Sequence, residues 1–271
     1  MIKEKNKIKN IVLLGTILLI FSICVIGVNK NQDATIQTTS KSFDTKIMEW
    51  GMKRGKDNQQ PDFGTENRKI LEENEGICVG NNIDKTIYLT FDEGYEAGYT
   101  ESILNILQQN NVKATFFITS HYLNTASTLV ERMINEGHII GNHTCNHPNM
   151  PTISDETIEE EIMKLHQAVY EKFNYEMKYF RPPQGKFNER TLKKTSELGY
   201  KTVMWSFAYS DWNEKKQPSI EEAKDKIISN FHCGEIMLLH PNSKTNAEVL
   251  DTIIKEAKNQ GYEFKSLDEF N

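Results

Sequence analysis

Short apolar runs alternate with amphipathic stretches along most of the chain after Lys85. The runs contain many β-branched and aromatic residues and are bounded by polar residues, Gly or Pro, which is typical of β-strands. We therefore predict strands over residues 86–91, 114–120, 138–142, 178–181, 201–207, 235–240 and 262–265.

The stretches between these runs carry apolar residues three or four positions apart, as in Ile158, Ile162, Leu165 and Val169. This spacing places the apolar side chains on one face of a helix. We predict helices over residues 99–109, 128–136, 157–173, 188–198, 219–230 and 246–259.

Strands and helices that alternate in this way predict an α/β fold with a parallel sheet. The periodicity fits both a doubly wound sheet and a closed barrel. In both architectures, the residues that follow the carboxyl ends of the strands form the functional site.

The first 28 residues differ from the rest of the chain. Lysines at positions 3, 5, 7 and 9 precede an uncharged run over residues 11–28, which as a helix would be roughly 27 Å long, close to the thickness of a bilayer core. We interpret residues 1–28 as a membrane anchor or, alternatively, a signal peptide, and the basic flank places the remainder outside the cytoplasm. Residues 29–42 are polar and indicate a tether, so the folded domain is predicted at residues 43–271.

Composition and charge narrow the classes of function. Of the 271 residues, 38% are hydrophobic, which is enough for a substantial core. The chain has 38 acidic and 32 basic residues, a net charge of −6, so nucleic acid is not an expected partner. The four cysteines form no CxxC pair, which argues against a zinc ribbon and a disulfide-dense scaffold.

Unusual polar residues lie at or just beyond the ends of five of the seven predicted strands. Each of these groups of residues, taken alone, has an ordinary structural explanation, such as a helix cap, a rigid turn or a buried structural histidine. Five such groups on one rim of the sheet are better explained by one active site. They are Asp92-Glu93-Gly94, His143 with His147, Arg181-Pro182-Pro183-Gln184-Gly185, Asp211-Trp212, and His240.

The strings TFDEG, HTCNH, RPPQG, DW and LLH resemble, in order, the five motifs of the polysaccharide deacetylases of carbohydrate esterase family 4. The resemblance covers the chain from Lys85 to the C-terminus. Longer strings such as YLTFDEGYEAGYT and GYEFKSLDE are most similar to the N-acetylmuramic acid deacetylases of spore-forming bacteria, and this similarity extends back to about Phe43.

This resemblance implies a distorted (β/α)7 barrel, the NodB-like fold. It implies metal-dependent, hydrolytic de-N-acetylation of N-acetylmuramic acid in the glycan strands of peptidoglycan, which prepares muramic δ-lactam in the spore cortex. The expected location is extracytoplasmic, membrane-anchored or secreted, and includes the forespore intermembrane space. The expected catalytic domain is a monomer.

The resemblance also assigns roles to catalytic residues. Asp92 corresponds to the general base, and Arg181 beside it keeps the carboxylate ionised. His240 corresponds to the general acid that protonates the leaving amine, and Asp211 tunes it. The family pattern usually has a further Asp at the position of Ala208.

Glu93, His143 and His147 correspond to the family's ligands for a divalent ion, with zinc as the first choice and cobalt, manganese or magnesium as alternatives. Glu93 departs from the pattern, because the family usually has Asp there and muramic acid deacetylases often have Asn. A Glu is one methylene longer but remains an anionic oxygen ligand.

The remaining positions assigned by the resemblance face the substrate. They are Pro183, Trp212 and Gln184, whose backbone N–H corresponds to an oxyanion donor. Many relatives have Tyr at the position of Gln184, a substitution that a backbone donor tolerates.

Two other interpretations stay open at this point. One is an N-acetylglucosamine deacetylase acting on peptidoglycan, a chitin-like polymer or an exopolysaccharide. The other is a membrane-tethered, glycan-binding pseudoenzyme, favoured only by Glu93. A serine hydrolase is disfavoured because the chain has no GxSxG motif.

Overall fold

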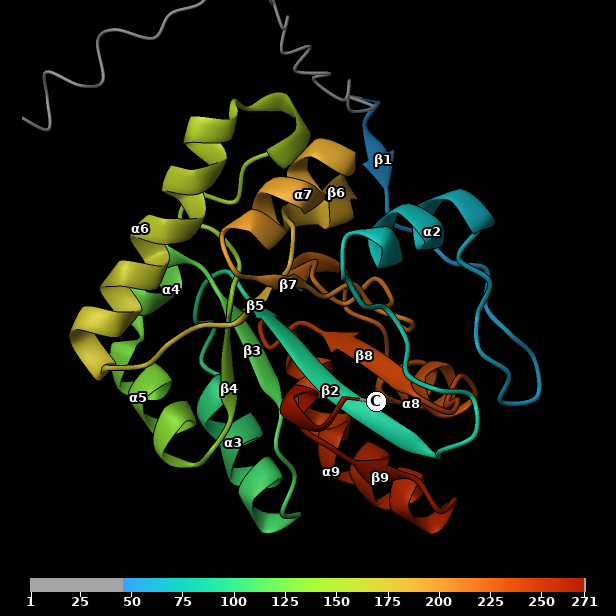
Figure 1. Ribbon diagram of the computed structural model, residues 1–271. Coiled ribbons are helices and arrows are strands. Elements are labelled where there is room, and N and C mark those ends of the chain that lie inside the picture. The colour runs from blue at the N-terminus through green and yellow to red at the C-terminus, as the bar shows by residue number, and fades with distance from the viewer. Residues whose placement is uncertain (1–45, 271) are drawn as a thin grey trace, which may run out of the picture. The chain divides into compact units, whose positions relative to one another are not determined.

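A parallel sheet lies at the centre of the computed structural model, which describes residues 46–270 (Figure 1). The sheet has seven strands in the order β7-β5-β4-β3-β2-β8, and β9 pairs with the first residues of β2. Its strands are β2 (Thr86–Glu93), β3 (Thr115–Ile118), β4 (Ile139–Asn142), β5 (Tyr179–Phe180), β7 (Lys201–Thr202), β8 (Glu235–Leu239) and β9 (Glu263–Phe264).

The sheet is curled, so that its two edges approach each other. Strand β7 forms one edge, while Phe207 pairs with Met237 of β8 at the other. Residues 203–207 therefore run from one edge to the other, and the parallel sheet forms a half-barrel. The predicted strand over residues 201–207 is too long, because only Lys201–Thr202 is a strand and Val203 and Phe207 make isolated pairings.

Helices cover the outside of this sheet (Figure 1). All six predicted helices are present, with ends shifted by a few residues. The structure adds helices α2 and α4, and Ser120 begins α4 rather than ending a strand because the Thr119 side chain accepts a hydrogen bond from the Tyr122 amide. The helices are α2 (Thr65–Glu73), α3 (Thr100–Gln109), α4 (Ser120–Thr125), α5 (Ser127–Asn135), α6 (Asp155–Phe173), α7 (Glu189–Glu197), α8 (Ile220–Ile228) and α9 (Lys244–Asn259).

A small antiparallel pair joins the start of the described chain to the middle of the sequence. Strand β1 (Met48–Glu49) pairs with β6 (Lys186–Phe187). Around this pair, Trp50, Phe63 and Leu71 form a second buried cluster with Phe187. This part of the fold carries no regular sequence period and was not predicted.

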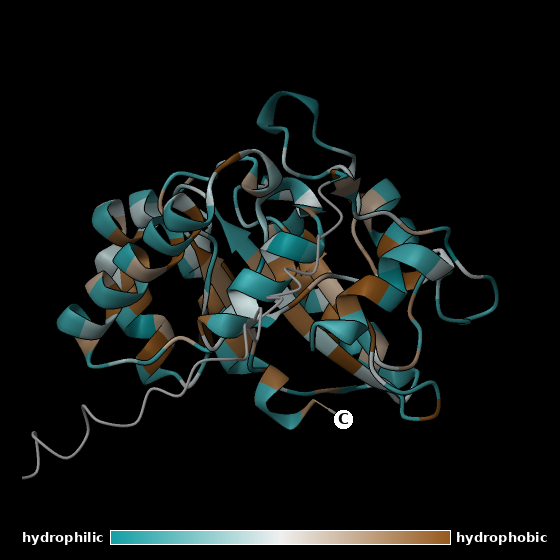
Figure 2. Ribbon diagram, turned by 45° about the horizontal axis from the view of Figure 1, so that its top comes forward, coloured by the Kyte–Doolittle hydropathy of each residue, from teal (hydrophilic) through white to brown (hydrophobic). Residues whose placement is uncertain are grey.

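The two faces of β2 have different surroundings. Successive side chains of a strand point to opposite faces. Ile87, Leu89 and Phe91 belong to the large cluster between sheet and helices, which Figure 2 shows as hydrophobic sheet surface under helices with hydrophilic outer faces. Tyr88 belongs instead to the cluster on the inner face. Asp92 is in the same register as Tyr88 and therefore faces the inside of the half-barrel.

The predicted membrane segment (1–28) and tether (29–42) lie outside the described residues. Within residues 46–270, no helix is both long enough and apolar enough to cross a membrane.

Candidate active site

Asp92 and Arg181 form a buried ion pair at the carboxyl ends of β2 and β5. Arg181 Nη1 lies 2.8 Å from Asp92 Oδ1, and the same nitrogen donates to Thr90 Oγ1 at 2.9 Å. Arg181 is fully buried, and its guanidinium lies 4.2 Å from the centre of the Phe117 ring. Burial alone would raise the pKa of Asp92, but the electrostatic interactions with Arg181, His143 and His240, together with the Arg181 hydrogen bond, outweigh it and the pKa is lowered. Asp92 is therefore an ionised carboxylate near neutral pH.

The two predicted histidines lie together beside Asp92. The His143 and His147 ring centres are 4.9 Å apart, and His143 Nε2 is 3.7 Å from Asp92 Oδ2. Burial lowers the pKa of His143 to about 4, so the ring is neutral. Its Nδ1 is 2.7 Å from the Arg181 carbonyl oxygen, which can only accept, so Nδ1 carries the proton. The Nε2 lone pair and Asp92 Oδ2 are thus two acceptors facing one small space.

The loop that carries the histidines is held from α6. Asn146 donates its backbone N–H and its side-chain amide to the two carboxylate oxygens of Glu161, at 2.8 and 2.6 Å. Thr144 and His147 adopt positive φ values of 71° and 55°, a conformation that needs such support in residues other than glycine. A fold-level contact therefore fixes the position of His147, which sequence spacing alone did not reveal.

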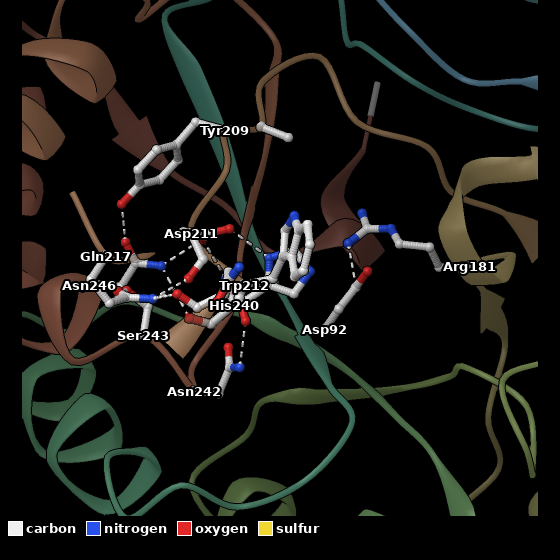
Figure 3. A network of polar contacts seen from close by, with 12 residues as sticks. Asp92, Arg181, Tyr209, Asp211, Trp212, Gln217, His240, Asn242, Ser243 and Asn246 are labelled. Atoms are coloured by element: carbon white, nitrogen blue, oxygen red, sulfur yellow. Dashed lines mark hydrogen bonds and ion pairs between the residues drawn. The ribbon is translucent and has the colours of Figure 1, made fainter. Parts of the chain in front are cut away.

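Asp211 and His240 form a second, hydrogen-bonded pair. The His240 Nδ1 lies 2.8 Å from Asp211 Oδ1, and the His240 backbone N–H donates to Asp211 Oδ2 at 2.8 Å. Asn246 also donates to Oδ2, at 2.6 Å (Figure 3). Burial alone would lower the pKa of His240, but the Asp211 charge and hydrogen bond outweigh it and the pKa is raised. The ring is thus held with Nδ1–H on Asp211, which leaves Nε2 for a ligand.

One residue of each pair, Asp92 and His240, lines a cavity of about 580 Å³. This volume is typical of small-molecule sites. The predicted residues Asp92, His143, His147, Gln184, Trp212 and His240 line the cavity. Pro183 is buried in the turn that carries Gln184, whose φ is 59°. The structure thus brings together most of the residues that the sequence singled out.

Exposed aromatic side chains mark the rim of the cavity. Tyr95 and Trp212 are 42% and 59% exposed although both are large. Asn242 ties them together, because its amide nitrogen donates to the Tyr95 hydroxyl at 2.8 Å and to the Trp212 carbonyl at 2.9 Å. Tyr95 also donates to Glu214 at 2.6 Å. Sequence analysis missed Tyr95 and Asn242, although each lies within three residues of a predicted site residue.

Glu93 does not join the two histidines. It is fully buried, and its Oε1 accepts a hydrogen bond from Thr100 Oγ1 of α3 at 3.3 Å. It follows Asp92 within β2, so the two side chains point to opposite faces of the sheet. Burial, together with the nearby charge of Glu96, raises the pKa of Glu93 well above its usual value. A carboxyl that points to the helix side is not placed to bind a metal ion together with His143 and His147.

The predicted three-ligand metal site is therefore not assembled as expected. Among residues 46–270, no three His, Cys, Asp or Glu side chains are grouped so that they could hold a metal ion. His143 and His147 face the cavity, whereas Glu93 faces α3. As arranged, the predicted set does not fit a two-histidine, one-carboxylate centre.

Comparison with known proteins gives consistent matches. The family model described as polysaccharide deacetylase matches residues 80–203. The peptidoglycan-N-acetylmuramic acid deacetylase PdaA of Bacillus subtilis is 43% identical over 221 residues, which cover 81% of this chain and 84% of that protein. A peptidoglycan-N-acetylglucosamine deacetylase of Bacillus cereus is 36% identical over 194 residues, covering 70% of this chain and 90% of the relative. The solved structure of Bacillus subtilis PdaA, a family 4 carbohydrate esterase, matches with a TM-score of 0.81 at 42% identity, and the match covers 83% of this chain and 97% of that one.

Proposed function

The chain belongs to the polysaccharide deacetylase family, carbohydrate esterase family 4, and we propose that it removes the N-acetyl group from N-acetylmuramic acid in peptidoglycan. Members of this family are hydrolases of carbon–nitrogen bonds. The observation that carries the proposal is one cavity lined by an ionised Asp92 and by His240, whose Nδ1 is held by Asp211. Amide hydrolysis needs both a base for the attacking water and an acid for the leaving amine.

Asp92 acts as the base in this reaction. A water between Asp92 Oδ2 and His143 Nε2, which are 3.7 Å apart, would donate one proton toward each acceptor. The carboxylate takes one proton while the water oxygen bonds to the acetamide carbon. Arg181 keeps Asp92 ionised and oriented.

The carbonyl oxygen becomes an anion in this step, and the backbone N–H of Gln184, on the turn that contains Pro183, donates to it. His240 Nε2 then gives its proton to the sugar nitrogen, and the carbon–nitrogen bond breaks. The products are acetate and a glycan with a free amine. No step assigned to these residues passes through a metal ion.

The rim supports a glycan as the substrate. Tyr95 and Trp212 offer exposed aromatic rings at the mouth of the cavity, and rings of this kind combine a large apolar surface with a polar edge. The apolar faces of a sugar ring pack well on such a surface. The hydrogen bonds through Asn242 hold the rim in place before substrate arrives.

The biological role that we propose follows from the product. A muramic acid amine lies on the same residue as its lactyl group, so its release permits closure of a δ-lactam, as in spore cortex. Peptidoglycan lies outside the cytoplasmic membrane. We therefore propose an extracytoplasmic, monomeric catalytic domain attached through residues 1–28, or secreted, in a compartment such as the forespore intermembrane space.

An N-acetylglucosamine substrate is the second candidate, and one observation favours it. None of the cavity-lining side chains in the described part of the chain is Lys or Arg, although a cation would complement the lactyl carboxylate of muramic acid. The 36% identical relative from Bacillus cereus is named for action on N-acetylglucosamine.

The test of function uses purified protein with peptidoglycan glycans, with and without peptide stems, and with N-acetylglucosamine oligomers. Each substrate is tested with a chelator and with zinc, cobalt, manganese or magnesium. We expect acetate release and a mass loss confined to muramic acid. Loss from glucosamine would establish the second candidate, and no loss under any condition would contradict deacetylation. Activity that survives the chelator would show that no dissociable ion is needed.

Glu93→Gln provides a separate test of the site. Because the Glu93 carboxyl is buried on the helix side of β2, we expect acetate release to stay near the wild-type rate. We also expect the zinc stoichiometry, measured by mass spectrometry of metal content, to be unchanged. Joint loss of zinc and activity in this variant would show that Glu93 turns toward His143 and His147 in the loaded protein.

A further inference from the structure

The segment of residues 46–63 lies before the part of the chain that matches the family model, yet it reaches the cavity wall. Trp50 donates its backbone N–H to the Gly185 carbonyl at 2.8 Å and its indole Nε1–H to the Trp205 carbonyl at 2.8 Å. Arg54 donates to the Ala208 carbonyl at 3.1 Å. Gly185, Trp205 and Ala208 all line the cavity. Three donors of one segment therefore hold three backbone positions of the cavity wall.

Trp50 is itself firmly placed. Only 7% of its surface is exposed, and its ring stacks on Phe63 with centres 5.3 Å apart. On another side its ring lies 6.2 Å from the Phe187 ring. Since β1 pairs with β6 directly before Trp50, backbone pairing and ring packing fix the direction of both donors.

The turn that Trp50 contacts adopts a conformation that needs support. Gln184 and Gly185 have φ values of 59° and 64°, and a residue other than glycine adopts a positive φ only at an energetic cost. Space is also tight, since a Cβ built on Gly185 would lie 2.7 Å from the Trp205 ring and 3.1 Å from Trp50 Cβ. The position of Gln184 thus depends on how Trp50 and Trp205 pack around its neighbour.

The same contacts reach the ion pair of the site. Arg181 donates from Nε to the Val203 carbonyl at 3.0 Å and from Nη2 to the Met204 carbonyl at 3.4 Å. These residues directly precede Trp205, whose carbonyl accepts the Trp50 indole. A displacement of this backbone would move the guanidinium that orients Asp92.

We propose that Trp50 is a positioning residue for the deacetylation reaction. Its two donors hold the carbonyls of Gly185 and Trp205, and so fix the Gln184 turn on one side and the support of Arg181 on the other. The inference rests on the proposed function, because the reaction gives these positions their roles. It assigns residues 46–63, which lie before the part matched by the family model, a role in turnover that is separate from their role in folding.

Trp50→Phe tests this inference in the full chain, because Phe can still stack on Phe63 but has no indole N–H. Misplacement of catalytic groups by about 1 Å can cost on the order of 100-fold in rate. We expect kcat to fall by roughly 10- to 100-fold with little change in KM. We also expect faster hydrogen–deuterium exchange in a peptide covering residues 182–188.

Leu71→Val is the matched control, since Leu71 belongs to the same buried cluster but does not line the cavity. It should lower the Tm while kcat and exchange over residues 182–188 stay at wild-type values. The inference would be overturned if kcat and exchange in Trp50→Phe stayed at wild-type values. It would also be overturned if Trp50→Phe and Leu71→Val both lost kcat in proportion to their loss of Tm. If the wild-type protein released no acetate from any substrate, the proposed function would fail, while the exchange comparison would still decide whether Trp50 holds the turn.

Discussion

Asp92→Asn is expected to abolish deacetylation, with kcat reduced by roughly 10²- to 10⁴-fold, the usual contribution of a positioned base. The amide has nearly the shape of the carboxylate but cannot take a proton from water. It also leaves the fully buried Arg181 without its counter-ion, which costs about 3 to 5 kcal/mol of stability when a buried pair is broken. A lower Tm should therefore accompany the loss of activity. Acetate release should be measured at a temperature well below the Tm of the variant.

Glu93→Gln is the matched control for Asp92→Asn, because it makes the same chemical change at the next residue of β2 but on the opposite face of the sheet. We expect the two variants to differ by at least about 100-fold in kcat. Equal losses of kcat in both variants, with an unchanged zinc content, would mean that the effect comes from disturbing the end of the strand. Full activity in Asp92→Asn would remove Asp92 from the role of base.

The contrast between Asp92 and Glu93 also shows how far sequence reasoning reaches. The order of strands and helices, and the gathering of the strand-end residues, follow from local patterns and from the rule that parallel strands end at one rim. The predicted strand ended at residue 91, so the alternation of side chains was not carried on to the next two residues. In the structure β2 runs to Glu93, and that extension alone sends the predicted ligand to the helix side.

The N-terminal segment could not be predicted for a different reason. Trp50 and its partner Trp205 are 155 positions apart, and a two-residue strand such as β1 leaves no period to detect. The hydrogen bond between Asp211 and His240 is also long-range, spanning 29 positions. The sequence indicated Asp211 and His240 by their positions at strand ends, and the family resemblance implied their roles, but the contacts that fix the proton on Nδ1 appear only in the fold.

Asp211→Asn is expected to reduce activity most at alkaline pH. The pKa of His240 is raised because the Asp211 charge and hydrogen bond outweigh burial. An acid catalyst works while it is protonated, so its contribution is present below this raised pKa and is lost as the pH rises through it. In the variant the negative charge is gone and burial lowers the pKa of His240, so the loss begins at a lower pH.

The measurement is the pH profile of kcat/KM, which reports the groups of the free enzyme. In Asp211→Asn we expect the alkaline limb to move to lower pH. At pH values where His240 is still protonated in the wild type but not in the variant, we expect kcat/KM of the variant to be lower by roughly 10²- to 10⁴-fold. Thr245→Val is the control, because the Thr245 hydroxyl donates to the Pro218 carbonyl at 2.9 Å rather than to Asp211 or His240; its alkaline limb should not move. An unchanged alkaline limb in Asp211→Asn would show that a group other than His240 delivers the proton, because the Asp211 charge and hydrogen bond raise the pKa of His240.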